Sequence, residues 1–168
     1  MEKQVVSGFM ESTRNVFETM LHMQVEFERL GSLPRPTPSG DLSVVVEVSG
    51  DVDGYADFRC PLETARRIYA MMSGRNDAPS IDDVSDAIGE VAGMIAGGAA
   101  SRLQWNDLTV SCPSVTVGSF LAADARNEHR RAFIACDCDC GPFTLEIAVQ
   151  RSAAPEAAAC AAEAEDAQ

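Results

Sequence analysis

The feature that most constrains the fold of this chain is a long helix that contains four glycines. Residues 85–103 read SDAIGEVAGMIAGGAASRL, and the glycines are Gly89, Gly93, Gly97 and Gly98. Each glycine in a helix costs about 1 kcal/mol relative to alanine. Solvent gains nothing from glycine, whereas a closely approaching backbone or helix does. We therefore expect something to pack closely on this helix.

The helix, predicted over residues 81–104, has two stripes when its residues are spaced at about 100°. The apolar stripe is predicted to face the core and comprises Val84, Ile88, Val91, Ile95, Ala99 and Leu103. The stripe roughly opposite, which we call the acidic ridge, comprises Asp86, Glu90, Gly93 and Gly97. This ridge is either a solvated face with incidental acids or a shallow docking surface, and Gly89 adds a small residue that favours docking. The pattern gives no reason for Gly98.

The other periodic segments surround this helix. Residues 3–22 and 62–73 have helical periodicity, Gly74 is suited to end the second helix, and Ser80 or Asp82 can cap the long one. Alternating apolar residues predict strands over 42–50, 54–60, 108–118 (interrupted by Pro113), 130–140 and 143–151, with a short extended piece over 24–30 and a proline-rich loop over 31–40. The order predicts an α+β fold: an antiparallel or mixed sheet with long helices on one face.

Length and charge limit the classes of function. We predict one domain over residues 1–151, followed by an Ala/Glu-rich acidic tail over residues 152–168 that lacks stable structure. The net charge of −13 argues against a nucleic-acid partner, because phosphate contacts require clustered Lys and Arg. No apolar run approaches the roughly 18 residues that span a membrane, and charged residues come too early for a signal peptide. We therefore expect a cytoplasmic protein without a membrane partner.

Three of the six cysteines alternate with aspartates in the sequence CDCDC. On a strand, Cys136, Cys138 and Cys140 would lie on one face, which favours a row of core-facing thiols. The alternative is a thiol metal site, but the spacing lacks the paired Cys-x-x-Cys arrangement that zinc sites use. We predict no metal site, and the alternative would require zinc to co-purify with the protein.

The glycine-containing helix, with the segment that follows it, is similar to a known family. AIGEVAGMIAGG is followed by CPSVTVG, and together they resemble the CheX/CheC/FliY family of bacterial chemotaxis phosphatases. The family motif is Asp or Ser, three residues, Glu, two residues, Asn, and then Pro about twenty residues later. Asp86, Glu90 and Pro113 match this motif, whereas Gly93 stands at the Asn position. The resemblance covers most of residues 1–151 and is greatest to the single-motif CheX form.

The resemblance implies a role in chemotaxis signalling and a CheX-like α+β fold. In the family, the Glu engages a lysine of the phosphorylated response regulator CheY, and the Asn positions the water that attacks the aspartyl phosphate. Carried over to this chain, the catalytic positions are Glu90 and Gly93, and the partner-binding residues are Asp86, Glu90, Gly97 and Pro113. No cofactor is expected, since magnesium would belong to the regulator. CheX proteins pair as homodimers, which implies a dimer here.

Two functions stay open at this level. One is an aspartyl-phosphate phosphatase that is impaired, because glycine has no side chain to orient water. The other is a non-catalytic module that binds a response regulator or dimerises. The first helix repeats the motif spacing as Ser7, Glu11 and Arg14, which are either the remnant of a second site or ordinary surface residues.

Overall fold

The computed structural model describes residues 3–31, 42–75, 78–103, 108–118 and 131–152. These residues form one antiparallel sheet of seven strands in the order β1-β6-β7-β3-β2-β4, with β5 also paired to β2. The predicted α+β fold is confirmed. In chain order, the elements are α1 (Lys3–Met20), β1 (Glu26–Gly31), β2 (Leu42–Gly50), β3 (Val52–Cys60), α2 (Leu62–Ser73), α3 (Ile81–Arg102), β4 (Leu108–Val110), β5 (Ser114–Val117), β6 (Arg131–Asp137) and β7 (Phe143–Arg151).

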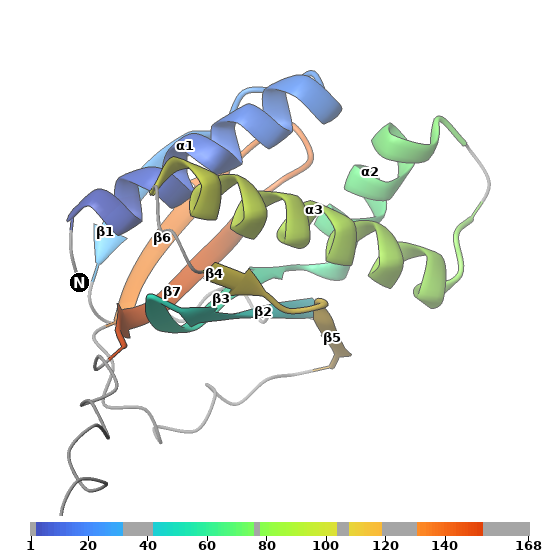
Figure 1. The fold of residues 1–168 in the computed structure, drawn as a ribbon. Coiled ribbons are helices and arrows are strands. Elements are labelled where there is room, and N and C mark those ends of the chain that lie inside the picture. Colours follow the sequence, from blue (N-terminus) through green and yellow to red (C-terminus); the bar gives the residue numbers. More distant parts are fainter. Residues whose placement is uncertain (1–2, 32–41, 76–77, 104–107, 119–130, 153–168) are drawn as a thin grey trace, which may run out of the picture.

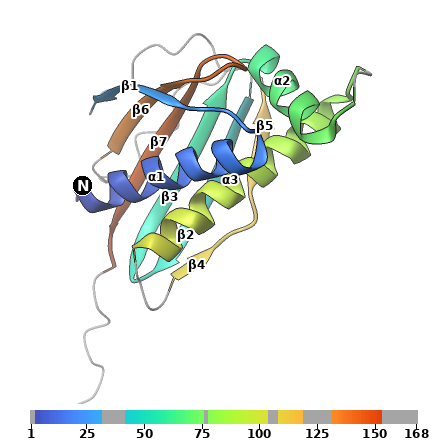
Figure 2. The same cartoon turned by 90° about the horizontal axis from the view of Figure 1, so that it is seen from above.

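Helices α1 and α3 lie side by side on one face of the sheet, and α2 lies beside the N-terminal part of α3 (Figures 1 and 2). An aromatic stack joins the two layers. The ring of Phe17 on α1 stacks on Phe143 of β7 at 5.0 Å between centroids, and Phe143 stacks on Phe58 of β3 at 4.9 Å. All three side chains are buried, so this stack anchors the N-terminal helix to the centre of the sheet.

Most predicted elements are confirmed, including the short extended piece as β1 and the interruption at Pro113, which separates β4 from β5. The strand predicted over 130–140 is too long, because β6 ends at Asp137. The proline-rich residues 32–40 and the tail residues 153–168 fall outside the described ranges, so the predictions for them stand as predictions.

Helix α3 begins directly after Ser80, because the side chain of Ser80 caps its first turn. The Asp83 N–H donates to Ser80 Oγ at 3.1 Å, and the Ser80 N–H donates to Asp83 Oδ2 at 3.1 Å. These reciprocal bonds form a capping box, which satisfies backbone donors that the helix itself cannot pair. Of the two predicted caps, Ser80 is the one that the structure uses. At the end of α2, Gly74 adopts the left-handed conformation (φ 63°), as expected for a terminating glycine.

The apolar stripe of α3 faces the core as predicted. All six of its members, Val84, Ile88, Val91, Ile95, Ala99 and Leu103, are buried. The stripe lies over β2 and β3 and fixes the rotation of α3 about its axis. The acidic ridge is thereby turned away from the sheet.

The contact between α1 and α3 explains Gly98. A Cβ at this position would clash with Ser12 Oγ, which itself donates a hydrogen bond of 2.7 Å to the carbonyl of Ile95. On the other helix, a Cβ at Gly8 would lie 3.2 Å from Leu103 Cγ. Glycine on each helix therefore lets the two backbones approach closely, as small residues do at tight helix crossings. Within the described ranges, no helix is long and apolar enough to cross a membrane.

Candidate functional site

The acidic ridge is accessible at its two carboxylates. Asp86 and Glu90 are exposed, whereas Gly93 and Gly97 are half-buried. Within the described part of the chain, neither carboxylate forms an ion pair. Asp86 and Glu90 are four residues apart on α3, so both lie on one face about one turn apart. The ridge therefore presents uncompensated negative charge.

Pro113 brings the β4–β5 link against the same helix. A Cβ built on Gly93 would lie 3.4 Å from Pro113 Cγ, an ordinary van der Waals distance, and no other described atom outside the helix lies within 4 Å. The structure therefore places Gly93 and Pro113 side by side, although they are twenty residues apart in the sequence. A Cβ on Gly97 would meet no described atom within 4 Å apart from the adjacent part of the helix itself. The surface is thus closed at Gly93 on the Pro113 side and open at Gly97.

Gly89 is not part of an open surface. It is buried, and a Cβ there would lie 3.5 Å from Val115 Cγ2 and 3.8 Å from Pro113 Cβ. The interpretation of Gly89 as a docking residue is therefore wrong, because Pro113 of the β4–β5 link and Val115 of β5 cover it. Sequence periodicity could not reveal this contact, since the link comes from a distant part of the chain.

The motif-like residues of α1 have contacts typical of surface residues. Ser7 Oγ donates to Glu11 Oε1 at 3.3 Å, and Glu11 lies 3.9 Å from Arg102 Nε on α3. The guanidinium of Arg14 lies over the ring of Phe27, 5.3 Å from its centroid. Glu11 and Arg14 thus each contact a different neighbouring element, and both are exposed. These contacts stabilise the surface only slightly.

The cysteine segment requires a correction. Because β6 ends at Asp137, Cys138 and Cys140 lie in and beside a turn rather than on a strand face with Cys136. Cys136 and Cys140 are nevertheless buried. Burial raises the pKa of both thiols, to about 11 for Cys140, so they are protonated at neutral pH and react slowly. Among the described residues, no group of three or more His, Cys, Asp or Glu side chains is placed to hold a metal ion.

A charged network on the opposite face of the sheet was missed from the sequence. Asp57 and Glu146 are cross-strand partners and almost fully buried, and Arg59 bridges them at 2.6 Å and 3.0 Å. Arg131 lies 3.2 Å from Glu146, and Tyr55 donates to Glu146 at 2.8 Å. Burial, together with this hydrogen bond, raises the pKa of Tyr55 to about 12. The two-residue spacing of Asp57 and Arg59 places both on one strand face and could have indicated this network.

Comparisons with known proteins show which family this chain resembles. Residues 42–137, more than half of the chain, match the family described as chemotaxis phosphatase CheX. The crystal structure of a chemotaxis protein CheX from Desulfovibrio desulfuricans is similar at 26% identity and a TM-score of 0.76, over 87% of this chain and 99% of that chain. A CheC-like superfamily protein from Shewanella sp. PV-4 is similar at 20% identity and a TM-score of 0.79, over 89% and 99% of the two chains.

One similar structure contains a second protein. CheX from Borrelia burgdorferi, solved as a complex with CheY, BeF3 and magnesium, has a TM-score of 0.74 over 88% of this chain and 98% of that chain. Its identity to this chain is 17%, so this likeness concerns the fold. Comparison with curated proteins found no significant match.

Proposed function

Because this chain belongs to the chemotaxis phosphatase CheX family, we propose that it binds a phosphorylated CheY-type response regulator through the acidic ridge of α3. The observation that carries the proposal is Glu90, an exposed carboxylate without an ion-pair partner in the described chain, one helical turn from Gly93, beside which Pro113 lies. The complex of the Borrelia burgdorferi CheX with CheY gives support from a protein of the same fold.

In this proposal, Glu90 forms an ion pair with a lysine of the regulator, and Asp86 adds to the attraction. Both carboxylates are exposed and point away from the sheet. An exposed carboxylate pays little desolvation until the partner covers it, and the negative ridge steers a basic surface toward it. Gly97 and Pro113 would complete the contact, because neither presents a bulky or charged side chain.

In this proposal, the protein accelerates hydrolysis of the regulator's aspartyl phosphate only slightly. Hydrolysis of an aspartyl phosphate requires a water that is aligned for attack on phosphorus, and a side-chain amide beside the phosphate can supply that alignment. Position 93 has no side chain, and the described neighbour within 4 Å of its would-be Cβ is the apolar ring of Pro113. Magnesium, in this scheme, belongs to the regulator and stays with it. Loss of water positioning lowers the rate on the order of 100-fold.

A non-catalytic binding module is the second candidate, and Gly93 itself favours it. The ridge keeps the residues that would make an ion pair and lacks the one that would do chemistry. Such a chain would sequester the activated regulator without dephosphorylating it.

We further propose that the protein works in the cytoplasm, where response regulators act, and that it forms a homodimer. Sedimentation velocity would test the dimer, and a single species at monomer mass would contradict it.

The decisive experiment measures the decay of a phosphorylated CheY-type regulator from the same organism. Wild type, Glu90→Ala, Gly93→Asn, Gly93→Asn with Glu90→Ala, and Gly93→Ala would be compared. Gly93→Asn fits sterically, since its Cβ would lie at an ordinary distance from Pro113. Gly93→Ala is the matched control, because it adds the Cβ at the same position without the amide.

We expect wild type and Gly93→Ala to change the decay little, and Gly93→Asn to accelerate it on the order of 100-fold over wild type. Addition of Glu90→Ala should remove that gain, because the regulator would no longer dock. Strong acceleration by wild type that Glu90→Ala abolishes would show that the site works without an amide at position 93. If none of the proteins binds the regulator or alters its decay, the proposed partner is wrong.

A further inference from the structure

The edge strand formed by β4 and β5 contains one extra residue. Val110 pairs with Val48 of β2, and Ser114 pairs with Val45. Between these pairs, the three residues 111–113 lie opposite only two residues of β2, at positions 46 and 47. This is a β-bulge, a feature that often re-aims a side chain at the edge of a sheet.

The bulge decides which side chains face α3. Successive residues of a strand point to opposite faces, and Val110 lies opposite the buried Val48. Without the extra residue, the alternation would turn Cys112 and Ser114 toward α3. With it, Pro113 lies against Gly93 and Val115 against Gly89, while Cys112 is exposed. Without this change of register, Pro113 would not face Gly93, and these two motif residues would not lie side by side.

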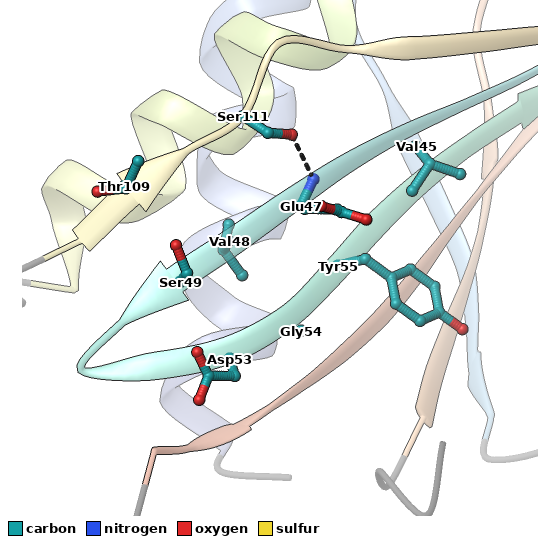
Figure 3. A pocket seen from close by; sticks show the side chains of 9 residues that line it. All are labelled: Val45, Glu47, Val48, Ser49, Asp53, Gly54, Tyr55, Thr109 and Ser111. Carbon is teal, nitrogen blue, oxygen red and sulfur yellow. Dashed lines mark hydrogen bonds between the residues drawn. The ribbon is translucent and has the colours of Figure 1, made fainter. Parts of the chain in front are cut away.

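Ser111 holds the bulge in place. Its N–H donates to the carbonyl of Glu47 at 2.9 Å, and its Oγ accepts a hydrogen bond of 2.9 Å from the Glu47 N–H (Figure 3). The hydroxyl therefore takes the place of a main-chain carbonyl in the ladder with β2. It also donates to the carbonyl of Cys112 at 3.2 Å, directly before Pro113. Pro113 has no N–H to donate to the ladder, and proline is therefore tolerated in sheets mainly at edges and bulges such as this one.

We infer that Ser111 is a positioning residue for the docking surface: it sets the register that presents Pro113 to Gly93. The inference rests on the proposed function, since it concerns the same surface. Ser111 is not part of the ridge, and it lines a hollow on the face of the sheet away from the helices, together with Glu47, Ser49 and Tyr55 (Figure 3). It acts on the ridge through the backbone of the bulge. Loss of its hydroxyl leaves the Glu47 N–H without its acceptor, so that Pro113 is held less firmly against Gly93.

The test combines binding with a local spectroscopic readout. The dissociation constant for the regulator, activated with beryllium fluoride and magnesium, would be measured for wild type, Ser111→Ala, Ser111→Thr and Ser49→Ala. Amide chemical shifts of Gly89 and Gly93 would be recorded for each free protein, and thermal unfolding would establish that each is folded. Ser111→Thr keeps the hydroxyl, and Ser49→Ala removes a hydroxyl that lines the same hollow.

We expect Ser111→Ala to weaken binding roughly threefold to tenfold, as loss of one such hydrogen bond allows, and to shift both glycine amides. Ser111→Thr and Ser49→Ala should each keep the wild-type dissociation constant and the wild-type shifts of both glycine amides. Unaltered binding and unaltered amide shifts in folded Ser111→Ala would overturn the role of Ser111 while leaving the proposed function intact. Absence of binding by wild type would instead contradict the proposed function, and this inference with it.

Discussion

Helix α3 contacts α1 on one side and the β4–β5 link on the other, and a glycine lies at each contact. Toward α1, the space above Gly98 is filled by Ser12, whose hydroxyl is already bonded to the carbonyl of Ile95. Toward the link, the space above Gly93 is bounded by Pro113 at an ordinary contact distance. The first side is a closed helix crossing, whereas the second leaves room for a side chain. Glycines that look alike in the sequence thus serve packing on one side and a shallow surface on the other.

The largest effect should come from Gly98→Ala. The added methyl group must displace Ser12, which breaks a buried hydrogen bond and separates the two helices. We expect a net loss of about 2 kcal/mol in the free energy of unfolding, because overpacking outweighs the roughly 1 kcal/mol gained in helix propensity. Urea denaturation followed by circular dichroism would measure it. An unchanged midpoint would mean that the α1 side is as open as the ridge side.

A double-mutant cycle sharpens the same comparison. Ser12→Ala alone should destabilise by about 1 kcal/mol, because the buried hydrogen bond from the Ser12 hydroxyl to the Ile95 carbonyl is lost. It also removes the atom with which a methyl group at position 98 would clash. Gly98→Ala should therefore be less harmful in the Ser12→Ala background by about 1 kcal/mol, whereas two independent effects would simply add.

Much of this arrangement could be predicted, and the exceptions share one physical cause. The buried stripe from Val84 to Leu103 follows from a period of 3.6 residues, and the Ser80 cap and the Gly74 stop follow from local chemistry. The reason for Gly98 could not be predicted, because the residue that contacts it, Ser12, lies on α1, far away in the sequence. The burial of Gly89 and the pairing of Asp57 with Glu146 depend likewise on strand register, which is a non-local property.

A smaller effect of opposite sign is expected for Gly97→Ala. Apart from the adjacent part of the helix itself, no described atom lies within 4 Å of the position that the new Cβ would take. The substitution should therefore stabilise the protein by about 0.5–1 kcal/mol, since alanine is favoured over glycine in a helix. The same denaturation assay would measure it beside Gly98→Ala, one residue away. Destabilisation would show that the open side of α3 is covered.

The smallest expected effect concerns the N-terminal turn of α3, which precedes the ridge. Hydrogen bonds from Ser80 lower the pKa of Asp83 below its ordinary value of 3.8. Because the folded state holds this carboxylate ionised, its contribution to stability is present above the ordinary pKa and is lost as the pH falls through the lowered value. Asp83→Asn should therefore show a shallower loss of stability than wild type below about pH 4. Identical acid-denaturation profiles would contradict a functioning capping box.

The most direct test of the account is to map the regulator on this protein by NMR. Isotope-labelled protein would be titrated with the unlabelled regulator, activated with beryllium fluoride and magnesium, and amide shifts would be followed. We predict that the perturbed amides cluster around Asp86, Glu90 and Gly93, with the neighbours of Pro113, while those around Gly8 and Ser12 stay unchanged. Perturbations centred instead on the exposed face of α1, around Ser7, Glu11 and Arg14, would contradict the assignment of the docking surface to the ridge of α3.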